Sequence, residues 1–370
     1  MKLLFAIKNF TDAVGGAEKV LCVISSLLVE RGHDVTVLSF DSAGGKSFYP
    51  IDERVKQIRL PVGDATKPAD FFVSIKRMFQ LRRHVKELKP DVTIGFMHSI
   101  FIPLAFSLVG TGFPVVASEH IVPQHYKTRP FQFLLFAISS LLIKKITVLS
   151  SAVKDMYPFF IQNKMIPLSN PLLLKNITTE SRVDNNQKII LNVGRLDLQK
   201  DQKTLIKAFA KVAKQHPEWR LKIIGEGELR PELEHLVQDL GLQERIDLPG
   251  VTSEIDQEYQ KATIFVMSSL YESFGLVTAE AMSHGLPVIG FADCPGTNEL
   301  IKHNHTGYLI DTASDRVISL ATAMSNLMAD AKKQQEFGTN GLNDIKNKFA
   351  PEKICSLWED MLESVAAKGA

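Results

Sequence analysis

The stretch "TIFVMSSLYESFGLVTAEAM", residues 263–282, decides how the second half of the chain folds. It begins with an apolar run typical of a buried strand, turns at Gly275 and continues as a helical segment. Glu272 precedes the turn and Glu280 follows it, with seven residues between them, and "PVIGF" (287–291) begins another apolar run. A strand, a glycine turn and a helix in this order predict one βα unit of a parallel sheet.

The same alternation runs through both halves of the 370 residues, a length that suits two domains. Apolar runs followed by helical stretches are "LLFAI", "DVTVLS", "DVTIGF", "PVVAS" and "ITVLS", then "KIILNVG", "LKIIG", "RIDLPG", "TIFVMS" and "PVIGF". We therefore predict an α/β fold of two doubly wound Rossmann-like domains, residues 1–170 and 188–350, joined by a linker at 171–187. A helix at 351–370 is free to pack back on the first domain. The ligand crevices are expected at the carboxyl ends of the strands, facing a cleft between the domains.

Composition narrows the class of protein. An apolar fraction of 45% and a charged fraction of 23% are typical of a soluble globular protein, and three scattered cysteines favour a reducing cytoplasm. The apolar run near residue 1 is too short for a signal peptide, and the run at 130–143 is too short to span a bilayer.

Charge is distributed unevenly between the halves. Residues 1–180 hold 22 Lys and Arg against 14 Asp and Glu, whereas residues 181–370 hold 21 against 27. The segment 75–89 contributes Lys76, Arg77, Arg82, Arg83, Lys86 and Lys89 at helical spacing. A solvated helix face explains this segment alone, but the nearby apolar run at 130–143 also favours contact with an anionic membrane surface. No recognised nucleic-acid motif accompanies the basic residues, so we expect no nucleic-acid partner.

Two loops of the second half suit a diphosphate. Gly194-Arg195 follows "KIILNV", and Lys200 precedes a helix, so both cations could meet one anion, although two unrelated surface cations are the alternative. The first N–H groups of the helix beginning at Gly275 form a second anion site. Glu280, about 7 Å further along that helix, suits ribose hydroxyls, and Glu272 suits a sugar on the other side of the diphosphate. The ligand described is a nucleotide diphosphate sugar; an ordinary acidic helix start is the alternative.

These motifs resemble those of a known family. "ESFGLVTAE", preceded by "GRLDLQK" and "GEGEL" and followed by "GLPVIG", with "GGAE" and "SEH" in the first half, resembles the retaining GT-B glycosyltransferases of family 4 (group 1). The resemblance is closest to enzymes that extend lipid-linked oligosaccharides or surface polysaccharides, and it covers nearly the whole chain.

The resemblance implies roles for individual residues. His120 and Glu272 would act at the reacting centre, although a lone histidine after a strand is more often structural, and His98, His125, His303 and His305 have no stronger claim. Arg195 and Lys200 would bind the diphosphate, Glu280 the ribose, and Val251 the base through its backbone. The remaining substrate contacts would come from Gly15, Gly16, Ser273, Phe274, Gly275, Leu276 and Val277. Pro295-Gly296-Thr297 keeps one glycine where the family often has two.

The implied reaction moves a hexose or N-acetylhexosamine from a UDP-linked donor to a hydroxyl of a lipid-linked glycan or polysaccharide, with retention through same-face attack. The first domain would bind the acceptor, at the cytoplasmic face of the cell membrane. No cofactor is implied, and because no Asp-x-Asp occurs, no metal clamp is expected. A nicotinamide enzyme is disfavoured because "AVGGAEK" lacks G-x-G-x-x-G. A sugar-nucleotide epimerase, a phosphorylase and a non-catalytic binding protein remain open.

Overall fold

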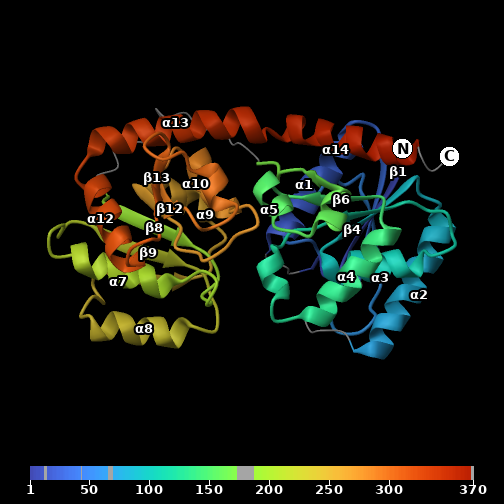
Figure 1. Ribbon diagram of the computed structural model, residues 1–370, viewed down its shortest axis with the longest axis horizontal. Helices are drawn as coiled ribbons and strands as arrows, with labels where there is room; N and C mark the ends of the chain where they lie inside the picture. Colours follow the sequence, from blue (N-terminus) through green and yellow to red (C-terminus); the bar gives the residue numbers. More distant parts are fainter. Residues whose placement is uncertain (12–14, 43, 66–69, 173–186, 368–370) are drawn as a thin grey trace. The chain divides into compact units, whose positions relative to one another are not determined.

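A computed structural model describes residues 1–11, 15–42, 44–65, 70–172 and 187–367. The chain divides into two compact units, Met1–Leu173 with Phe349–Ala370, and Leu174–Lys348. Each unit is built on a parallel sheet, which confirms the predicted α/β fold (Figure 1). The predicted linker, residues 171–187, lies almost wholly outside the described residues.

Within its described residues, the first unit holds a seven-stranded sheet of order β3-β2-β1-β4-β5-β6-β7. Phe5 is aligned between Val37 and Ile94, and all three are fully or almost fully buried, as expected for central strands covered on both faces. The strands are β1 (Lys2–Ile7), β2 (Asp34–Ser39), β3 (Lys56–Arg59), β4 (Val92–Phe96), β5 (Val115–Ser118), β6 (Lys145–Val148) and β7 (Met165–Pro167).

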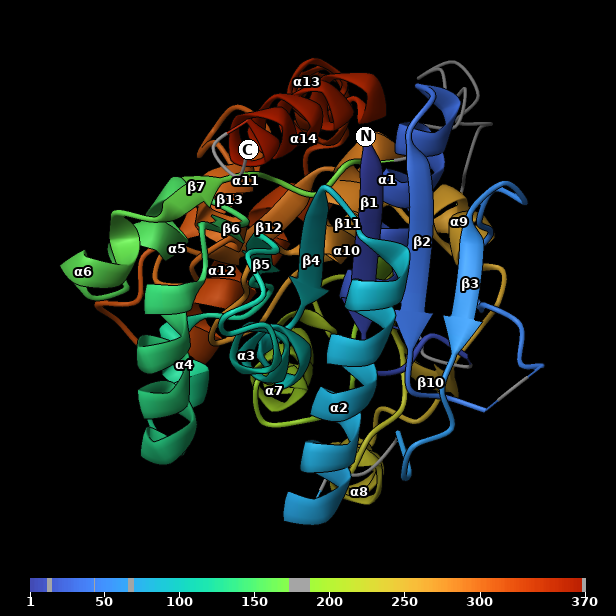
Figure 2. The ribbon, with the colours of Figure 1, turned by 90° about the vertical axis from the view of Figure 1, so that its right-hand side faces the viewer.

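The helices of the first unit connect the strands of its parallel sheet. Helix α1 contacts α14, whereas α3 contacts both α2 and α4, and Figure 2 shows α3 between those two helices. The helices are α1 (Gly16–Glu30), α2 (Phe71–Leu88), α3 (His98–Ser107), α4 (Pro130–Leu142), α5 (Ser151–Asp155), α6 (Phe159–Gln162) and α14 (Pro351–Ala366), with a 3-10 turn, η1 (Pro123–Tyr126).

Helix α14 packs into the core of the first unit, although it follows the second unit in the sequence. The Trp358 ring stacks on Phe96 of β4 at 6.1 Å between ring centroids and lies 6.5 Å from Phe5 of β1. At the helix surface, Glu359 accepts from Arg31 at 2.8 Å and pairs with His33 at 2.7 Å. Apolar burial therefore holds α14 against this sheet, and ion pairs fix its position.

The described residues of the second unit form a six-stranded sheet of order β10-β9-β8-β11-β12-β13. Its strands are β8 (Ile189–Val193), β9 (Arg220–Ile224), β10 (Ile246–Gly250), β11 (Ile264–Val266), β12 (Val288–Phe291) and β13 (Gly307–Ile310). Its helices are α7 (Gln202–Val212), α8 (Arg230–Asp239), α9 (Ile255–Lys261), α10 (Leu276–Ser283), α11 (Thr297–Leu300), α12 (Arg316–Met328) and α13 (Ala331–Phe349).

Every predicted strand is present, but β3, β7 and β13 were not predicted. All three lie at sheet edges. β3 reads "KQIR" with exposed or half-buried side chains, and β7 has only three residues. Edge strands lack a second hydrogen-bonded neighbour and need no long apolar run, so they leave a weak signal in the sequence.

Candidate functional site

The loops after β8 and β9 pack closely in the second unit. The Gly194 N–H donates to Ile224 O at 3.0 Å, and the Leu196 N–H donates to Glu226 O at 2.9 Å. A Cβ on Gly225 would lie 1.9 Å from Gly194 O, so this close approach requires glycine. The "GRLDLQK" and "GEGEL" motifs therefore form one packed edge at the carboxyl ends of adjacent strands.

The side chain of Lys200 extends from this edge and contacts Glu272, which lies 72 positions later in the chain. The Lys200 Nζ lies 2.5 Å from Glu272 Oε1, and Ser269 Oγ donates to the same oxygen at 2.7 Å. The side chains are only 15% and 10% exposed, so the pair is sheltered from water. In such surroundings either charge alone would be unfavourable, so each depends on the other.

The remaining ammonium protons of Lys200 are available to a ligand. An ammonium has three donors, and the structure records one side-chain contact for it, to Glu272, within the described part of the chain. Arg195, by contrast, reaches Asp197 Oδ2 at 3.0 Å through a side chain that is 73% exposed. The two predicted diphosphate ligands therefore have different partners in this structure.

Helix α10 begins at the predicted turn. Gly275 is its N-cap with φ 79°, a left-handed conformation that favours glycine, and its carbonyl accepts from the Thr278 and Ala279 N–H groups. Phe274 is buried, whereas Ser273, Leu276 and Val277 are half-buried. The first N–H groups of a helix have no acceptor inside it, so this turn is chemically suited to an anion.

Gly296 supports the turn from a neighbouring loop. Its φ is 76°, and a Cβ there would lie 2.7 Å from Phe274 N and 2.9 Å from Glu272 O. The Glu272 N–H donates to Pro295 O at 3.2 Å. The single glycine of "CPGTNEL" therefore allows the loop to approach the backbone that carries Glu272, a role that the sequence analysis missed.

Glu280 has an aromatic neighbour that the sequence analysis also missed. The Tyr259 hydroxyl of α9 lies 3.2 Å from Glu280 Oε2 and 3.3 Å from Val277 O. Burial, together with the charge of Glu280, raises the pKa of Tyr259 well above its usual value, so it stays a donor. No strand-end pattern in the sequence distinguishes Tyr259 from an ordinary core residue.

Val251, the predicted contact to the base, follows β10 with 61% of its surface exposed.

In the first unit, His120 lies in a buried network just past β5. Its Nε2 is 2.9 Å from Ser118 Oγ, and its ring stacks on Phe96 at 5.1 Å between centroids. Burial lowers the pKa of His120 to about 4, so the ring is neutral near pH 7. A neutral imidazole donates or accepts a hydrogen bond, but it does not supply a positive charge.

Glu119 fixes the backbone that carries His120. Its Oε1 accepts from the His120 and Ile121 N–H groups at 2.9 and 3.1 Å, and its Oε2 accepts from the Tyr126 hydroxyl at 2.7 Å. Burial raises the pKa of Glu119 to about 7, although these hydrogen bonds oppose the rise. The "SEH" motif therefore contains a positioning acid as well as the predicted histidine.

His98 occupies a comparable place at the end of β4. It begins α3 directly after Met97, whose φ of 67° is unusual for a side chain with a Cβ. The His98 ring lies 5.4 Å from that of His125. Burial, with the charges of His125, Arg129 and Lys8, lowers the pKa of His98 to about 4.

The predicted glycines begin α1. Gly15 is the N-cap and Gly16 the first helical residue, while residues 12–14 of the same loop lie outside the described residues. A Cβ on Gly15 would lie 2.1 Å from Glu18 Oε2. Burial raises the pKa of Glu18. Gly15 thus gives room to an acid in the first turn of α1.

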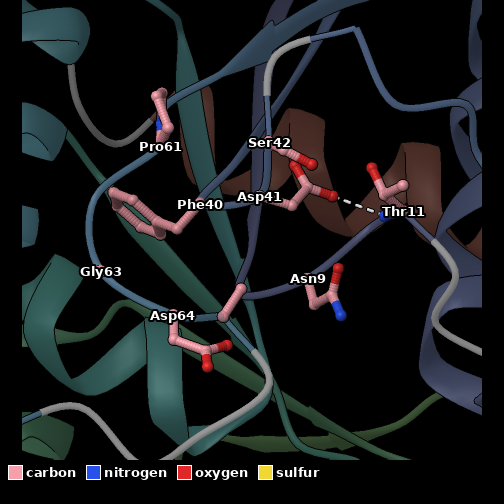
Figure 3. Close-up of a pocket in the computed structure, with 9 residues that line it drawn as sticks. Asn9, Thr11, Phe40, Asp41, Ser42, Pro61, Gly63 and Asp64 are labelled. Carbon is pink, nitrogen blue, oxygen red and sulfur yellow. Dashed lines mark hydrogen bonds between the residues drawn. The ribbon is translucent and has the colours of Figure 1, made fainter.

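A cavity of about 330 Å³ lies beside the carboxyl ends of β1, β2 and β3 (Figure 3). Asn9, Ser42 and Asp64 give it polar walls, and Phe40 adds an aromatic one. Asp41 is held by the Phe10 and Thr11 N–H groups at 2.7 and 2.5 Å. Burial alone would raise the pKa of Asp41, but hydrogen bonds from Ser39 and Thr11 hold it below its usual value. The cavity presents carboxylate, amide and hydroxyl groups, a combination that suits a polyol.

Two further properties bear on the site. Among the described residues, no group of three His, Cys, Asp or Glu side chains is placed to hold a metal ion. None of the described helices has the length and apolar content needed to cross a membrane.

Both halves of the chain match family models. Residues 14–158 match Glycosyltransferase Family 4, and residues 175–344 match Glycosyl transferases group 1. An uncharacterised glycosyltransferase of Haemophilus influenzae is 30% identical over 84% of this chain and 86% of its own length. An α-1,4-N-acetyl-D-galactosaminyltransferase of Campylobacter jejuni, whose name gives a GalNAc-containing diNAcBac-PP-undecaprenol substrate, is 28% identical over 99% of this chain and 98% of its own length.

Solved structures agree on the fold. Sucrose-phosphate synthase from Thermosynechococcus elongatus has a TM-score of 0.84 at 18% identity, covering 99% of each chain. Anabaena HepE in complex with UDP and glucose has a TM-score of 0.79 at 20% identity, covering 98% of this chain and all of the other. The GT-B fold expected from the motifs is confirmed. On these matches, the chain belongs to the group 1 glycosyltransferases, with a family 4 domain in its first half.

Proposed function

We propose that this glycosyltransferase moves a hexose or N-acetylhexosamine from a UDP-linked donor to a hydroxyl of a lipid-linked glycan, with retention of the anomeric configuration. The observation that carries the proposal is the sheltered Lys200–Glu272 pair. Its acid, Glu272, lies four residues before the start of α10, which is suited to an anion. The Campylobacter relative named for an undecaprenol-linked glycan supports the acceptor, and HepE, described with UDP and glucose, supports the donor.

Lys200 is proposed to bridge Glu272 and the donor diphosphate. One ammonium proton is held by the carboxylate, which leaves two donors for phosphate oxygens. Together with the first N–H groups of α10, this cation meets the charge that develops on the leaving diphosphate. Because these groups are in place before the reaction, they need no reorganisation as the sugar–phosphate bond breaks.

The two glutamates are proposed to bind different parts of the donor. Glu272 accepts from hydroxyls of the transferred sugar, and Glu280, positioned by Tyr259, accepts from ribose. Arg195 adds a second cation to the diphosphate, and Val251 contacts the base through its backbone. A covalent nucleophile is not assigned, and same-face attack by the acceptor hydroxyl accounts for retention.

The first unit is proposed to bind the acceptor. Its polar cavity beside Asn9 and Asp64 offers partners for sugar hydroxyls (Figure 3). Neutral His120 is proposed to contact the donor sugar by a hydrogen bond rather than by charge. We propose that the enzyme works as a peripheral protein at the inner face of the cell membrane, where it would meet a lipid-linked acceptor.

A donor panel tests the proposal. Purified protein is incubated with UDP-glucose, UDP-galactose and their N-acetylamino counterparts, with and without an undecaprenyl-diphosphate glycan, and UDP release and the product anomer are measured. We expect acceptor-dependent UDP release and an α-linked product from an α-linked donor. Conversion of the donor without acceptor would instead show an epimerase. Phosphate-dependent cleavage of a glycan would show a phosphorylase, and donor binding without turnover would show a non-catalytic binding protein. A product with the inverted anomeric configuration would refute retention but not the transfer of the sugar.

A further inference from the structure

Helix α4 exposes apolar side chains where a helix on a protein surface normally exposes polar ones. Its 13 residues, "PFQFLLFAISSLL", include no charged side chain. Phe131, Leu134, Ile138 and Leu141, spaced by three or four residues, are 71%, 53%, 44% and 73% exposed. This spacing places them on one face of the helix.

Helix α2 carries a second exposed stripe of mixed character. Phe72, Lys76, Phe79, Arg83 and Lys86 follow one another at spacings of four and three residues, and all are exposed. The stripe therefore alternates aromatic rings with cations along one helix face. One acid, Glu87, bonds Arg83 at 2.8 Å, so part of that charge is balanced locally.

The two helices belong to the same unit and flank α3, which contacts both (Figure 2). Beside the end of α4, Lys164 Nζ donates to Ser140 O and Leu141 O at 2.6 and 3.1 Å. Helix α6, which ends just before Lys164, exposes Phe159 and Phe160. We call the stripes of α2 and α4 together the apolar–basic face, which comprises Phe72, Lys76, Phe79, Arg83, Lys86, Phe131, Leu134, Ile138 and Leu141.

The charges on either side of α4 in the sequence have one sign. Residues 120–154 contain no Asp or Glu, and Lys127, Arg129 and Lys144, at either end of α4, are exposed. A symmetric contact between two copies would place the same cations opposite one another, which is unfavourable. A bilayer containing anionic lipid offers an apolar interior to the stripe on α4 and phosphates to the cations.

We propose that the apolar–basic face seats the first unit on an anionic bilayer, with the α4 stripe in the boundary between headgroups and acyl chains. The α2 stripe lies along the headgroups, with its aromatic rings directed toward the acyl chains and its cations at lipid phosphates. The inference deepens the proposed function, because it rests on an acceptor that is lipid-linked. It specifies the side of the first unit that faces the lipid.

Vesicle binding by the full chain tests this directly. Vesicles of phosphatidylcholine alone, or with phosphatidylglycerol, are sedimented with the protein at low salt and at about 0.5 M salt, where exposed charges are strongly screened. We expect binding to the anionic vesicles, reduced at high salt. The α4 variant is Phe131→Ser, Leu134→Ser, Leu141→Ser, and the α2 variant is Lys76→Gln, Arg83→Gln, Lys86→Gln. Each should lower partitioning about tenfold or more.

Matched controls lie in other parts of the chain. Leu240, Ile318 and Leu357 are exposed apolar residues, Lys207 and Lys211 are exposed cations of α7, and Lys214 is an exposed cation just past its end. Substituting these sets with Ser and Gln respectively should leave binding unchanged. Because every replaced side chain is exposed, circular dichroism should show an intact fold in all variants.

A second readout separates this inference from the proposed catalytic function. The α4 variant should lose activity on a vesicle-embedded acceptor while keeping it on a short-chain, water-dispersed acceptor. If no acceptor is used at all, the catalytic proposal fails and vesicle binding still stands on its own. Equal vesicle binding by wild type and both variants, or none at low salt, would overturn the inference. Concentration-dependent dimerisation abolished by the α4 variant would assign the face to a second copy instead.

Discussion

Replacing Glu272 with Gln is expected to lower turnover strongly while leaving the affinity for free UDP unchanged or slightly higher. In the structure this carboxylate occupies one donor of the Lys200 ammonium at 2.5 Å and accepts from Ser269 at 2.7 Å. The amide keeps the shape and one acceptor oxygen but removes the negative charge. The ammonium is then no longer partly neutralised by a carboxylate, so its attraction to phosphate is not reduced.

Lys200→Met gives the contrasting result. A charge-assisted hydrogen bond in a sheltered site contributes about 1.5–3 kcal/mol, which corresponds to about 10- to 150-fold in affinity. Because the Lys200 side chain is only 15% exposed, we expect the upper half of that range. For Glu272→Gln, losing a contact that strengthens in the transition state should lower kcat roughly 100-fold.

Calorimetry with UDP and turnover with the full donor distinguish these effects. Because both tryptophans, Trp219 and Trp358, are buried, their fluorescence reports whether each variant is folded. The reasoning is wrong if Glu272→Gln weakens UDP binding as much as Lys200→Met does. In that case the acid acts on the diphosphate by holding the lysine, and its assignment to the sugar has to be abandoned.

Three other substitutions or titrations test separate parts of the site. Glu280→Gln should weaken UDP binding several-fold, measured by calorimetry, and unchanged affinity would exclude ribose as its partner. Gly296→Ala should lower turnover with little loss of secondary structure, because its Cβ would press on Phe274 N at 2.7 Å; normal kinetics would show that the turn adapts. His98 and His120, with pKa values lowered to about 4, should show neutral-ring NMR shifts down to about pH 4. Because an unfolded histidine titrates near 6.5, each contributes stability that is lost as the pH falls from about 6.5 to about 4; an NMR midpoint near 6.5 would contradict their burial.

The sequence predicted the repeating part of the fold well and the contacts poorly. Central strands such as β1 and β12 are continuous apolar runs because both of their faces are buried, and that demand is visible in the sequence. The Lys200–Glu272 pair is different, because it depends on how two loops, 72 positions apart, meet at one sheet edge. Tyr259 and Glu119 were missed for a similar reason, since their importance lies in the partner of a single oxygen rather than in a pattern along the chain.

The order in which this chain is made differs from the order in which its parts can be completed. Trp358 and its neighbours on α14 fill the core beside Phe5 and Phe96, yet all of Leu174–Lys348 emerges from the ribosome before them. Until then the sheet of the first unit has an uncovered apolar surface, while the second unit already has every strand it needs. The second unit is therefore able to fold first during translation, and the nascent first unit exposes an apolar surface that favours aggregation until α14 is made.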